Sequence, residues 1–191
     1  VLRIPLATWG MVLAHFGIAV SLLGMASESA FTEEKLVALA PGGSAELGGF
    51  KVTLESVAPV AGPNWTAMEA RIAVQKGDGT PQYLNPQARS FWAPAQQTTE
   101  SALLTRWNGQ LYAVVGDKAA DGRWQLRLWW KPLVTLIWFG GLVIAFGGAL
   151  SIFGRLVTDL RRRQADRREV EEQAELAQLR GGAVAPAGGA G

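Results

Sequence analysis

Two long uncharged and mostly apolar runs enclose a segment in which apolar and polar residues alternate. The first run covers residues 4–26 and the second covers residues 132–154. At about 1.5 Å per helical residue, each run makes a helix of roughly 34 Å, which is enough to cross a bilayer core of about 30 Å. The pattern therefore predicts a membrane protein of mixed class, with two transmembrane α-helices at residues 4–26 and 132–154.

The segment between the runs, residues 27–131, has the period of β-strands. Phe50, Val52 and Leu54 alternate with polar neighbours, and residues 68–75 and 124–128 repeat this alternation. Turn signals follow at residues 77–79 and at Asn108 with Gly109. We expect five or six antiparallel strands that form a small sandwich or barrel-like domain without intervening helices.

Arginine placement predicts the orientation. Arg3 precedes the first run, and six arginines follow the second: Arg155, Arg161, Arg162, Arg163, Arg167 and Arg168. The positive-inside rule then makes both ends cytoplasmic and residues 27–131 periplasmic, in a multi-pass protein of the bacterial inner membrane. Residues 1–3 become a cytoplasmic end or preceding loop, residues 155–180 a cytoplasmic charged helix, and residues 181–191 a disordered Gly/Ala tail.

A cleaved signal peptide is the alternative for the first run. Small residues at positions 26–30 resemble a cleavage site, but the apolar core of a signal is usually only about 7–15 residues long. The run here is longer, and the chain begins at Val1 instead of methionine, so we expect an internal span from a longer protein.

Composition excludes several kinds of chemistry. The chain has no cysteine and one histidine, which lies outside the middle domain, so this domain alone offers neither a zinc site nor a catalytic triad. The net charge is only +2, which gives no nucleic-acid signal. We expect Arg89, Glu100 and Asp117 to be a solvated rim. Residues 129–131, Trp-Trp-Lys, are typical of an interfacial belt.

Glycines recur every seven residues in both apolar runs, at Gly10, Gly17 and Gly24 and at Gly140, Gly147 and Gly154. Small residues at this spacing let helices approach closely in lipid. We expect the two helices to pack against each other or inside a larger bundle.

His15 lies at the centre of the first run. Leaving an imidazole without partners in hydrocarbon costs roughly 2–7 kcal/mol, so the ring must find a hydrogen-bond partner or a metal. At 100° per residue it points roughly 140–160° away from Gly10 and Gly17. Two kinds of partner for the His15 ring therefore stay open: a flat apolar ring system, or a carbonyl or hydroxyl group on a neighbouring helix.

Several stretches together resemble the C-terminal end of the CcmF-type cytochrome c haem lyase family. They are WGMVLAHFG at residues 9–17, NPQARSF at 85–91, TTE at 98–100, QLY at 110–112 with Gly116, KPLV at 131–134, IWFGG at 137–141 and GG at 147–148. One departure is Gln87-Ala88 before Arg89, where the family has Glu-Lys. We hypothesise that Arg89 orients a loop or partner and does not ligate haem.

The resemblance implies a function in cytochrome c maturation, the joining of haem vinyl groups to apocytochrome c thiols. His15 is then one axial ligand of the iron of a haem b held among transmembrane helices, and its mate lies on a helix outside this chain. The implied partners are membrane lipid, the haem chaperone CcmE, apocytochrome c, and CcmH/CcmI-type subunits that handle thiols and apocytochrome. The resemblance assigns no catalytic residue to this chain, which alone is expected to be inactive.

Two other classes of function fit the same residues. One is a structural or docking membrane subunit with a partner-binding exported β domain and no haem. The other is a membrane electron carrier with a quinone site.

Overall fold

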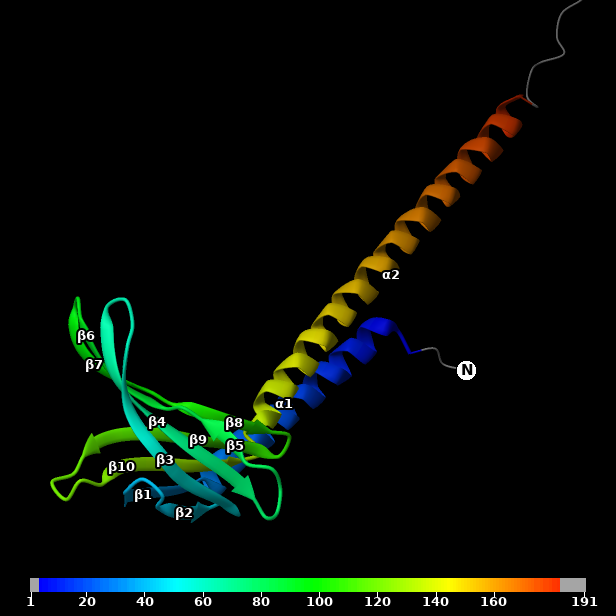
Figure 1. Ribbon diagram of the computed structural model, residues 1–191. Coiled ribbons are helices and arrows are strands. Elements are labelled where there is room, and N and C mark those ends of the chain that lie inside the picture. The colour runs from blue at the N-terminus through cyan, green and yellow to red at the C-terminus, as the bar shows by residue number, and fades with distance from the viewer. Residues whose placement is uncertain (1–3, 183–191) are drawn as a thin grey trace, which may run out of the picture. The chain divides into compact units, whose positions relative to one another are not determined.

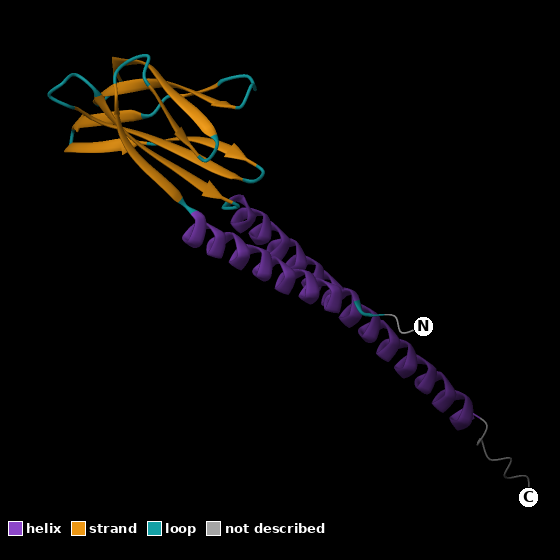
Figure 2. Cartoon of the chain, turned by 90° about the horizontal axis from the view of Figure 1, so that it is seen from below, coloured by secondary structure: helices purple, strands orange, loops and turns teal. Residues whose placement is uncertain are grey.

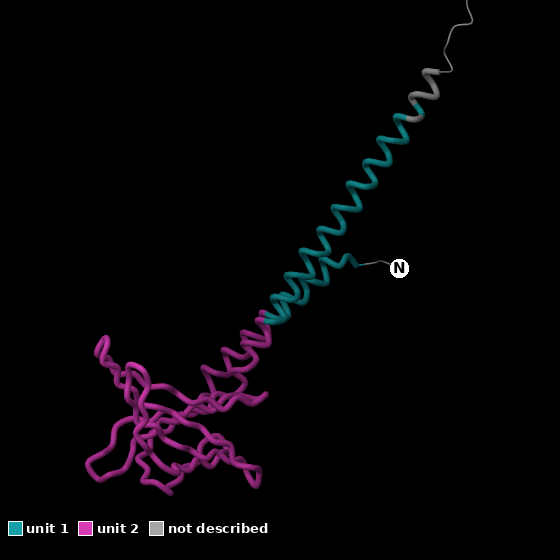
Figure 3. The backbone as a smooth tube through the Cα atoms, turned by 45° about the horizontal axis from the view of Figure 1, so that its top comes forward, with its two compact units in different colours: residues 1–17, 142–191 teal, residues 18–141 magenta. Residues whose placement is uncertain are grey.

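The computed structural model describes residues 4–182, which form two long helices and ten strands (Figure 1). Helix α1 covers Leu6–Phe31 and helix α2 covers Thr135–Gly182. Both are long and apolar enough, by length and composition, to cross a membrane. The expectations for residues 1–3 and for residues 183–191 of the Gly/Ala tail lie outside the described residues, whereas Gly181 and Gly182, expected to begin that tail, are the last residues of α2. The chain divides into two compact units, residues 1–17 with 142–191 and residues 18–141 (Figure 3).

The strands of residues 18–141 form two antiparallel sheets, which confirms the predicted sandwich (Figure 2). One sheet has the order β1-β10-β9-β8, and the other has the order β2-β3-β4-β6-β7 with β5 also paired to β4. The strands are β1 Glu33–Leu39, β2 Ser44–Leu47, β3 Phe50–Ala61, β4 Trp65–Lys76, β5 Gln82–Leu84, β6 Gln87–Trp92, β7 Ala95–Glu100, β8 Ala102–Arg106, β9 Gly109–Lys118 and β10 Trp124–Pro132.

The prediction of five or six strands was wrong, because ten are present in the described chain. The additional strands are short or polar, so hydrophobic alternation does not mark them. β7, for example, reads Ala-Gln-Gln-Thr-Thr-Glu and buries none of its side chains fully. Its strand conformation comes from pairing with β6 along the whole of its length, and local hydrophobicity contributes little.

Alternating residues of the long strands fill the space between the sheets, as their period predicts. The buried side chains are Phe50, Val52, Leu54, Ile72 and Val74 from one sheet and Leu111, Val115, Leu126 and Leu128 from the other. Burying an aliphatic or aromatic side chain of this size contributes about 1.5–3 kcal/mol, so this layer is the main source of stability for a domain without disulfides.

Trp130 corrects the expected interfacial belt. Its side chain is 7% exposed and packs on Phe50, with ring centroids 5.0 Å apart, so it belongs to the sandwich core. Trp107, in the turn between β8 and β9, and Trp138, in α2 itself, are exposed tryptophans near the start of that helix. The Thr135 hydroxyl donates to the Trp107 carbonyl (2.8 Å), which fixes this turn beside the first residue of the helix.

Helix boundaries differ from the uncharged runs at both helices. α1 continues past Ala26 to Phe31, so the residues that resemble a cleavage site are helical, and the hydroxyl of buried Ser27 donates to the Pro132 carbonyl (3.1 Å). α2 begins only at Thr135, because Pro132 still belongs to β10 and Leu133 turns the chain with a positive φ of 56°. Beyond Gly154, α2 continues without a break through the charged stretch.

Glycines bring the two helices into backbone contact. A Cβ on Gly10 would lie 2.5 Å from the Gly147 carbonyl oxygen, and one on Gly147 would lie 2.5 Å from the Ala14 nitrogen. Nearer the sandwich, a Cβ on Gly24 would lie 2.8 Å from the Ile137 nitrogen. The predicted packing of the two helices on each other is therefore confirmed at these positions, whereas Gly141 and Gly148 face open space.

We predict that Gly147→Leu destabilises the helix pair, since its side chain has no room beside α1. Overpacking of this kind costs about 1–3 kcal/mol. The measurement is the free energy of unfolding in detergent micelles. Gly148→Leu is the matched control, since nothing lies within 4 Å of its Cβ position, and equal effects of both changes would contradict the packing.

Candidate functional site

His15 lies on the exposed side of α1, while Gly10 and Gly17 on the other side are buried. Its Nδ1 lies 2.8 Å from the Met11 carbonyl oxygen, one helical turn earlier. A carbonyl can only accept, so Nδ1 carries a proton, and in the neutral ring with this tautomer Nε2 keeps its lone pair. Among the described residues, Nε2 has no hydrogen-bond partner. The structure thus satisfies one ring nitrogen inside the helix and leaves the other available to an external group.

The surroundings of His15 decide which metal group fits it. The described residues hold no cluster of three or more His, Cys, Asp or Glu side chains, so a zinc site with several protein ligands is not built here. A haem iron needs only one imidazole on each axial side, and an Nδ1–H bond to a carbonyl is a common way to orient such a ligand. A haem with its second ligand elsewhere fits this residue.

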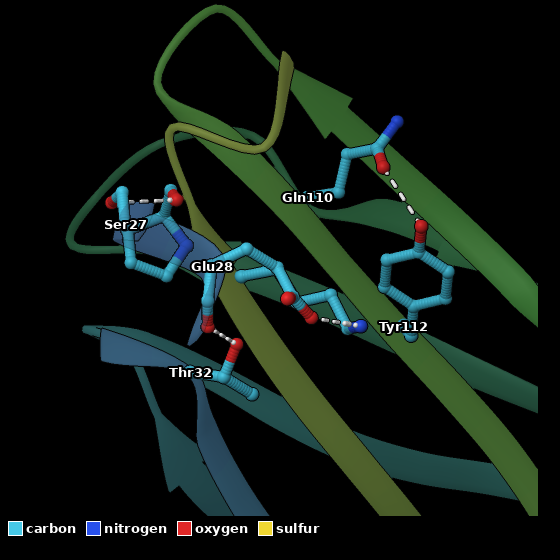
Figure 4. Close-up of polar contacts among 7 residues, drawn as sticks. Ser27, Glu28, Thr32, Gln110 and Tyr112 are labelled. Atoms are coloured by element: carbon cyan, nitrogen blue, oxygen red, sulfur yellow. Dashed lines mark hydrogen bonds and ion pairs between the residues drawn. The ribbon is translucent and has the colours of Figure 1, made fainter. Parts of the chain in front are cut away.

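A second cluster of polar residues joins the end of α1 to β9 and β10 (Figure 4). Lys131 Nζ donates to Glu28 Oε1 at 2.6 Å and lies 5.4 Å from the centroid of the Tyr112 ring. The Tyr112 hydroxyl donates to Gln110 Oε1 at 2.9 Å. The Thr32 hydroxyl donates to the Glu28 backbone carbonyl at 2.5 Å. Glu28 is therefore held through its side chain by Lys131 and through its backbone by Thr32.

The ion pair in this cluster is partly shielded from solvent. The side chains of Lys131 and Glu28 are 28% and 33% exposed, so their attraction is screened less than that of a surface pair. Nothing in the sequence pattern pairs these two residues, which lie 103 positions apart. They meet because β1, which follows α1, lies antiparallel to β10.

We predict an energetic coupling between Glu28 and Lys131. A double-mutant cycle with Glu28→Gln and Lys131→Met should give a coupling free energy of about 0.5–1 kcal/mol in unfolding experiments. Ser29→Ala, on an exposed neighbouring position, serves as the control. Strictly additive effects of the two changes would show that the pair does not contribute to stability.

A third cluster surrounds Arg89 on β6 and corrects the expectation of a solvated rim. Its side chain is only 22% exposed, Nη1 donates to Glu100 Oε1 (2.7 Å), and Nε donates to Gln87 Oε1 (2.8 Å). The guanidinium also lies 4.3 Å from the centroid of the Trp65 ring. Arg89 is therefore a fixed residue within a strand, while Asp117 is exposed, as expected.

The departure at Gln87 has a local physical explanation. Its amide nitrogen donates to Glu69 Oε2, while its amide oxygen accepts from Arg89. A carboxylate at position 87 could accept from Arg89 but would stand against the Glu69 carboxylate, so the amide suits this neighbourhood. Trp65 and Glu69 were missed in the sequence, since a half-buried aromatic and a single acidic residue carry no recognisable spacing.

The loop between β9 and β10 neutralises its own charges. Asp121 accepts hydrogen bonds from the Arg123 side chain and backbone, and these bonds lower the pKa of the Asp121 carboxyl from its usual value. On the outer face of the same sheet, a hydrogen bond from Arg127 likewise lowers the pKa of Glu34. These ion pairs lie on the exposed surface of the sandwich, and their residues are distant from His15 in the sequence.

The fold defines a class of protein, an antiparallel β-sandwich inserted between two helices that are long and apolar enough to cross a membrane. The family described as CcmF C-terminal beta-sandwich matches residues 30–132, which cover this sandwich. Since this match takes in more than half of the chain, the chain belongs to the CcmF family, and the resemblance inferred from the sequence is confirmed.

Relatives agree with this assignment. Cytochrome c-type biogenesis protein CycK of Bradyrhizobium diazoefficiens is 38% identical over 152 residues, which are 80% of this chain and 23% of the relative. Cytochrome c-type biogenesis protein CcmF of Escherichia coli is 37% identical over 146 residues, 76% of this chain and 22% of the relative. The chain thus spans less than a quarter of the length of these two relatives.

A solved structure, Cytochrome c Heme Lyase CcmF, shares the fold with a TM-score of 0.61. The alignment covers 74% of this chain and 24% of that chain, at 20% sequence identity. This likeness concerns the fold alone.

Proposed function

We propose that this chain is the C-terminal part of a membrane haem lyase of cytochrome c maturation, in which His15 is one axial ligand of a haem b. The observation that carries the proposal is the state of the His15 ring, with Nδ1 held by Met11 and Nε2 free on an exposed helix face. Family membership supports the same assignment. A second protein ligand to the iron would come from a residue outside this chain, whose only histidine is His15.

The chain's own residues position the imidazole and exclude water. The Met11 carbonyl holds the ring in one orientation, and the backbone contacts at Gly10 and Gly147 direct the opposite face of α1 outward. Apolar neighbours on that outward side, including Val12 and Phe16, keep it dry. A bound haem supplies redox and thioether chemistry, while the protein supplies orientation and a low dielectric.

We further propose that both helices span the bacterial inner membrane and that residues 27–131 are periplasmic. Large apolar side chains remain exposed along both helices, among them Met11, Leu22, Phe139 and Phe146, as expected for surfaces that meet lipid or other membrane helices. In this setting the sandwich can meet the haem chaperone CcmE, apocytochrome c, and CcmH/CcmI-type subunits on the periplasmic side.

The haem assignment is tested in the complete membrane protein with His15→Gly. Loss of the ligand should abolish or weaken the b-type absorption spectrum, and added imidazole should restore part of it by occupying the vacated position. Haem content and the visible spectrum after purification are the measurements.

Thr158→Ala is the matched control, because the Thr158 hydroxyl makes the same kind of bond to its own helix, at 2.8 Å to the Gly154 carbonyl. Its spectrum should be unchanged. Wild-type haem content in His15→Asn would overturn the assignment and favour the docking subunit without haem.

The topology is tested with single cysteines, which are unambiguous labels in a chain without native cysteine. Ala120→Cys, in the exposed β9–β10 loop, should react with a membrane-impermeant maleimide in intact spheroplasts. Arg163→Cys, in the charged part of α2, should react only after lysis. The reverse pattern of labelling would invert the proposed orientation.

A further inference from the structure

A groove of about 550 Å³ opens at one side of the sandwich, where the two sheets separate. One wall is the β6–β7 hairpin with Met68 of β4, and the other is the far end of β9 with Trp124 of β10. Figure 1 shows β6 and β7 as a hairpin that diverges from β9 and β10. All of these elements belong to the unit of residues 18–141.

The groove exists because one sheet ends earlier than the other. β8 pairs with β9 only as far as Ala102 opposite Ala113, whereas β10 accompanies β9 on its other side as far as Lys118. On the β8 side, residues 114–118 of β9 have no partner strand within the described chain. The preceding strand, β7, is hydrogen-bonded to β6 of the other sheet and not to β9, although both strands of this hairpin lie close to β9.

The wall opposite this free edge is the inward face of the β6–β7 hairpin. Ala88 packs against the core, and Met68 and Thr99 are its cross-strand partners, so all three share that face. Ser90 and its partner Gln97 continue the same face outward. The hairpin thus extends over a position where the facing sheet lacks a strand.

Free strand edges are usually protected by charges, bulges or a covering element. The β9 edge has only part of this protection, a register shift against β10, because Gly116 adds no side chain and the two charged residues, Asp117 and Lys118, are of opposite sign. Across the groove, Arg89 is already paired with Glu100. The balanced charge disfavours a nucleic acid or a lone anion, while the unpaired backbone edge suits another polypeptide strand.

Three stretches that carry the family resemblance meet at this groove. Arg89, Thr98 and Thr99 line one wall and Gly116 lines the other, although they are separated along the chain, whereas Ala88, also in the wall, is one of the departures from the family. Nothing in the sequence indicates that these stretches lie close together in space. These stretches thus line one groove of the sandwich.

We propose that this groove binds an extended, unfolded polypeptide segment by strand addition to the free edge of β9. The guest strand lies along residues 116–118 of β9, beyond the pairing of β9 with β8, and its alternate side chains contact Met68, Ala88 and Trp124 on the inward side. Only the identity of the bound segment rests on the proposed function. Under that function, the segment belongs to the unfolded protein that accepts haem. The groove would thus hold this acceptor on the sandwich.

The test uses the purified complete protein in nanodiscs and a short fluorescent peptide carrying a Cys-x-x-Cys-His segment with alkylated thiols. Gln97→Trp fills the groove and should weaken binding, measured by anisotropy, by about tenfold or more. Gln96→Trp is the matched control, because Gln96 is its exposed neighbour on β7 but does not line the groove. Its affinity should remain within about twofold of the wild type.

Peptide N-methylation separates strand addition from binding through side chains. Two peptides are compared, one N-methylated at its odd-numbered residues and one at its even-numbered residues. One of them should not bind and the other should bind like the unmodified peptide, because only every second N–H of a strand faces a given neighbour. Equal effects in both peptides, unchanged affinity of Gln97→Trp, or no binding to the wild-type protein would each overturn the proposal.

Two further measurements keep the result interpretable. A photo-crosslinker on Lys118→Cys should capture the peptide, and one on Glu46→Cys, on the far edge strand β2, should not. The b-type spectrum should be unchanged in Gln97→Trp, and peptide binding should be unchanged in His15→Gly. Failure of the groove proposal is therefore distinguishable from failure of the haem assignment.

Discussion

The antiparallel pairing of β1 with β10 is the interaction on which the rest of the chain depends. Glu33, two residues after α1, lies opposite Trp130, shortly before α2, so the pairing brings the ends of the two helices together at the sandwich. Glu28 can then reach Lys131, and Gly24 can contact Ile137. Within residues 18–141, the closing of residues 33–130 into one sandwich thus places the end of α1 beside the start of α2.

Two partly buried cations in the described part of the chain are held in ion pairs. Lys131 meets Glu28 beneath the Tyr112 ring, and Arg89 meets Glu100 beside Trp65. Each cation is thereby neutralised and covered by an aromatic face, which limits the cost of partial burial. His15 differs, since only one of its ring nitrogens is satisfied. That difference separates residues that stabilise the chain from the residue proposed to bind a cofactor.

Much of the fold was predictable because it depends on local periodicity. Alternation identified the long strands that form the core, and glycine spacing identified the helix faces that meet. The strands of the β6–β7 hairpin were missed, because they are polar and owe their conformation to pairing with neighbours. Trp130 was misjudged for a related reason: the sequence shows a tryptophan beside an apolar run, but only the sheet register turns it toward Phe50.

The sequence by itself determined the two apolar helices, an antiparallel β domain between them, the direction of His15 away from the glycine face, and the family. These properties follow from hydropathy, period and motif, which are read along one segment at a time. Only the tertiary structure decided that Glu28 pairs with Lys131, that Arg89 is fixed among Gln87, Glu100 and Trp65, and that β9 has a free edge facing a groove. Periodicity tells which face of a strand is apolar, but the partner of that face is chosen by the topology that brings distant segments together.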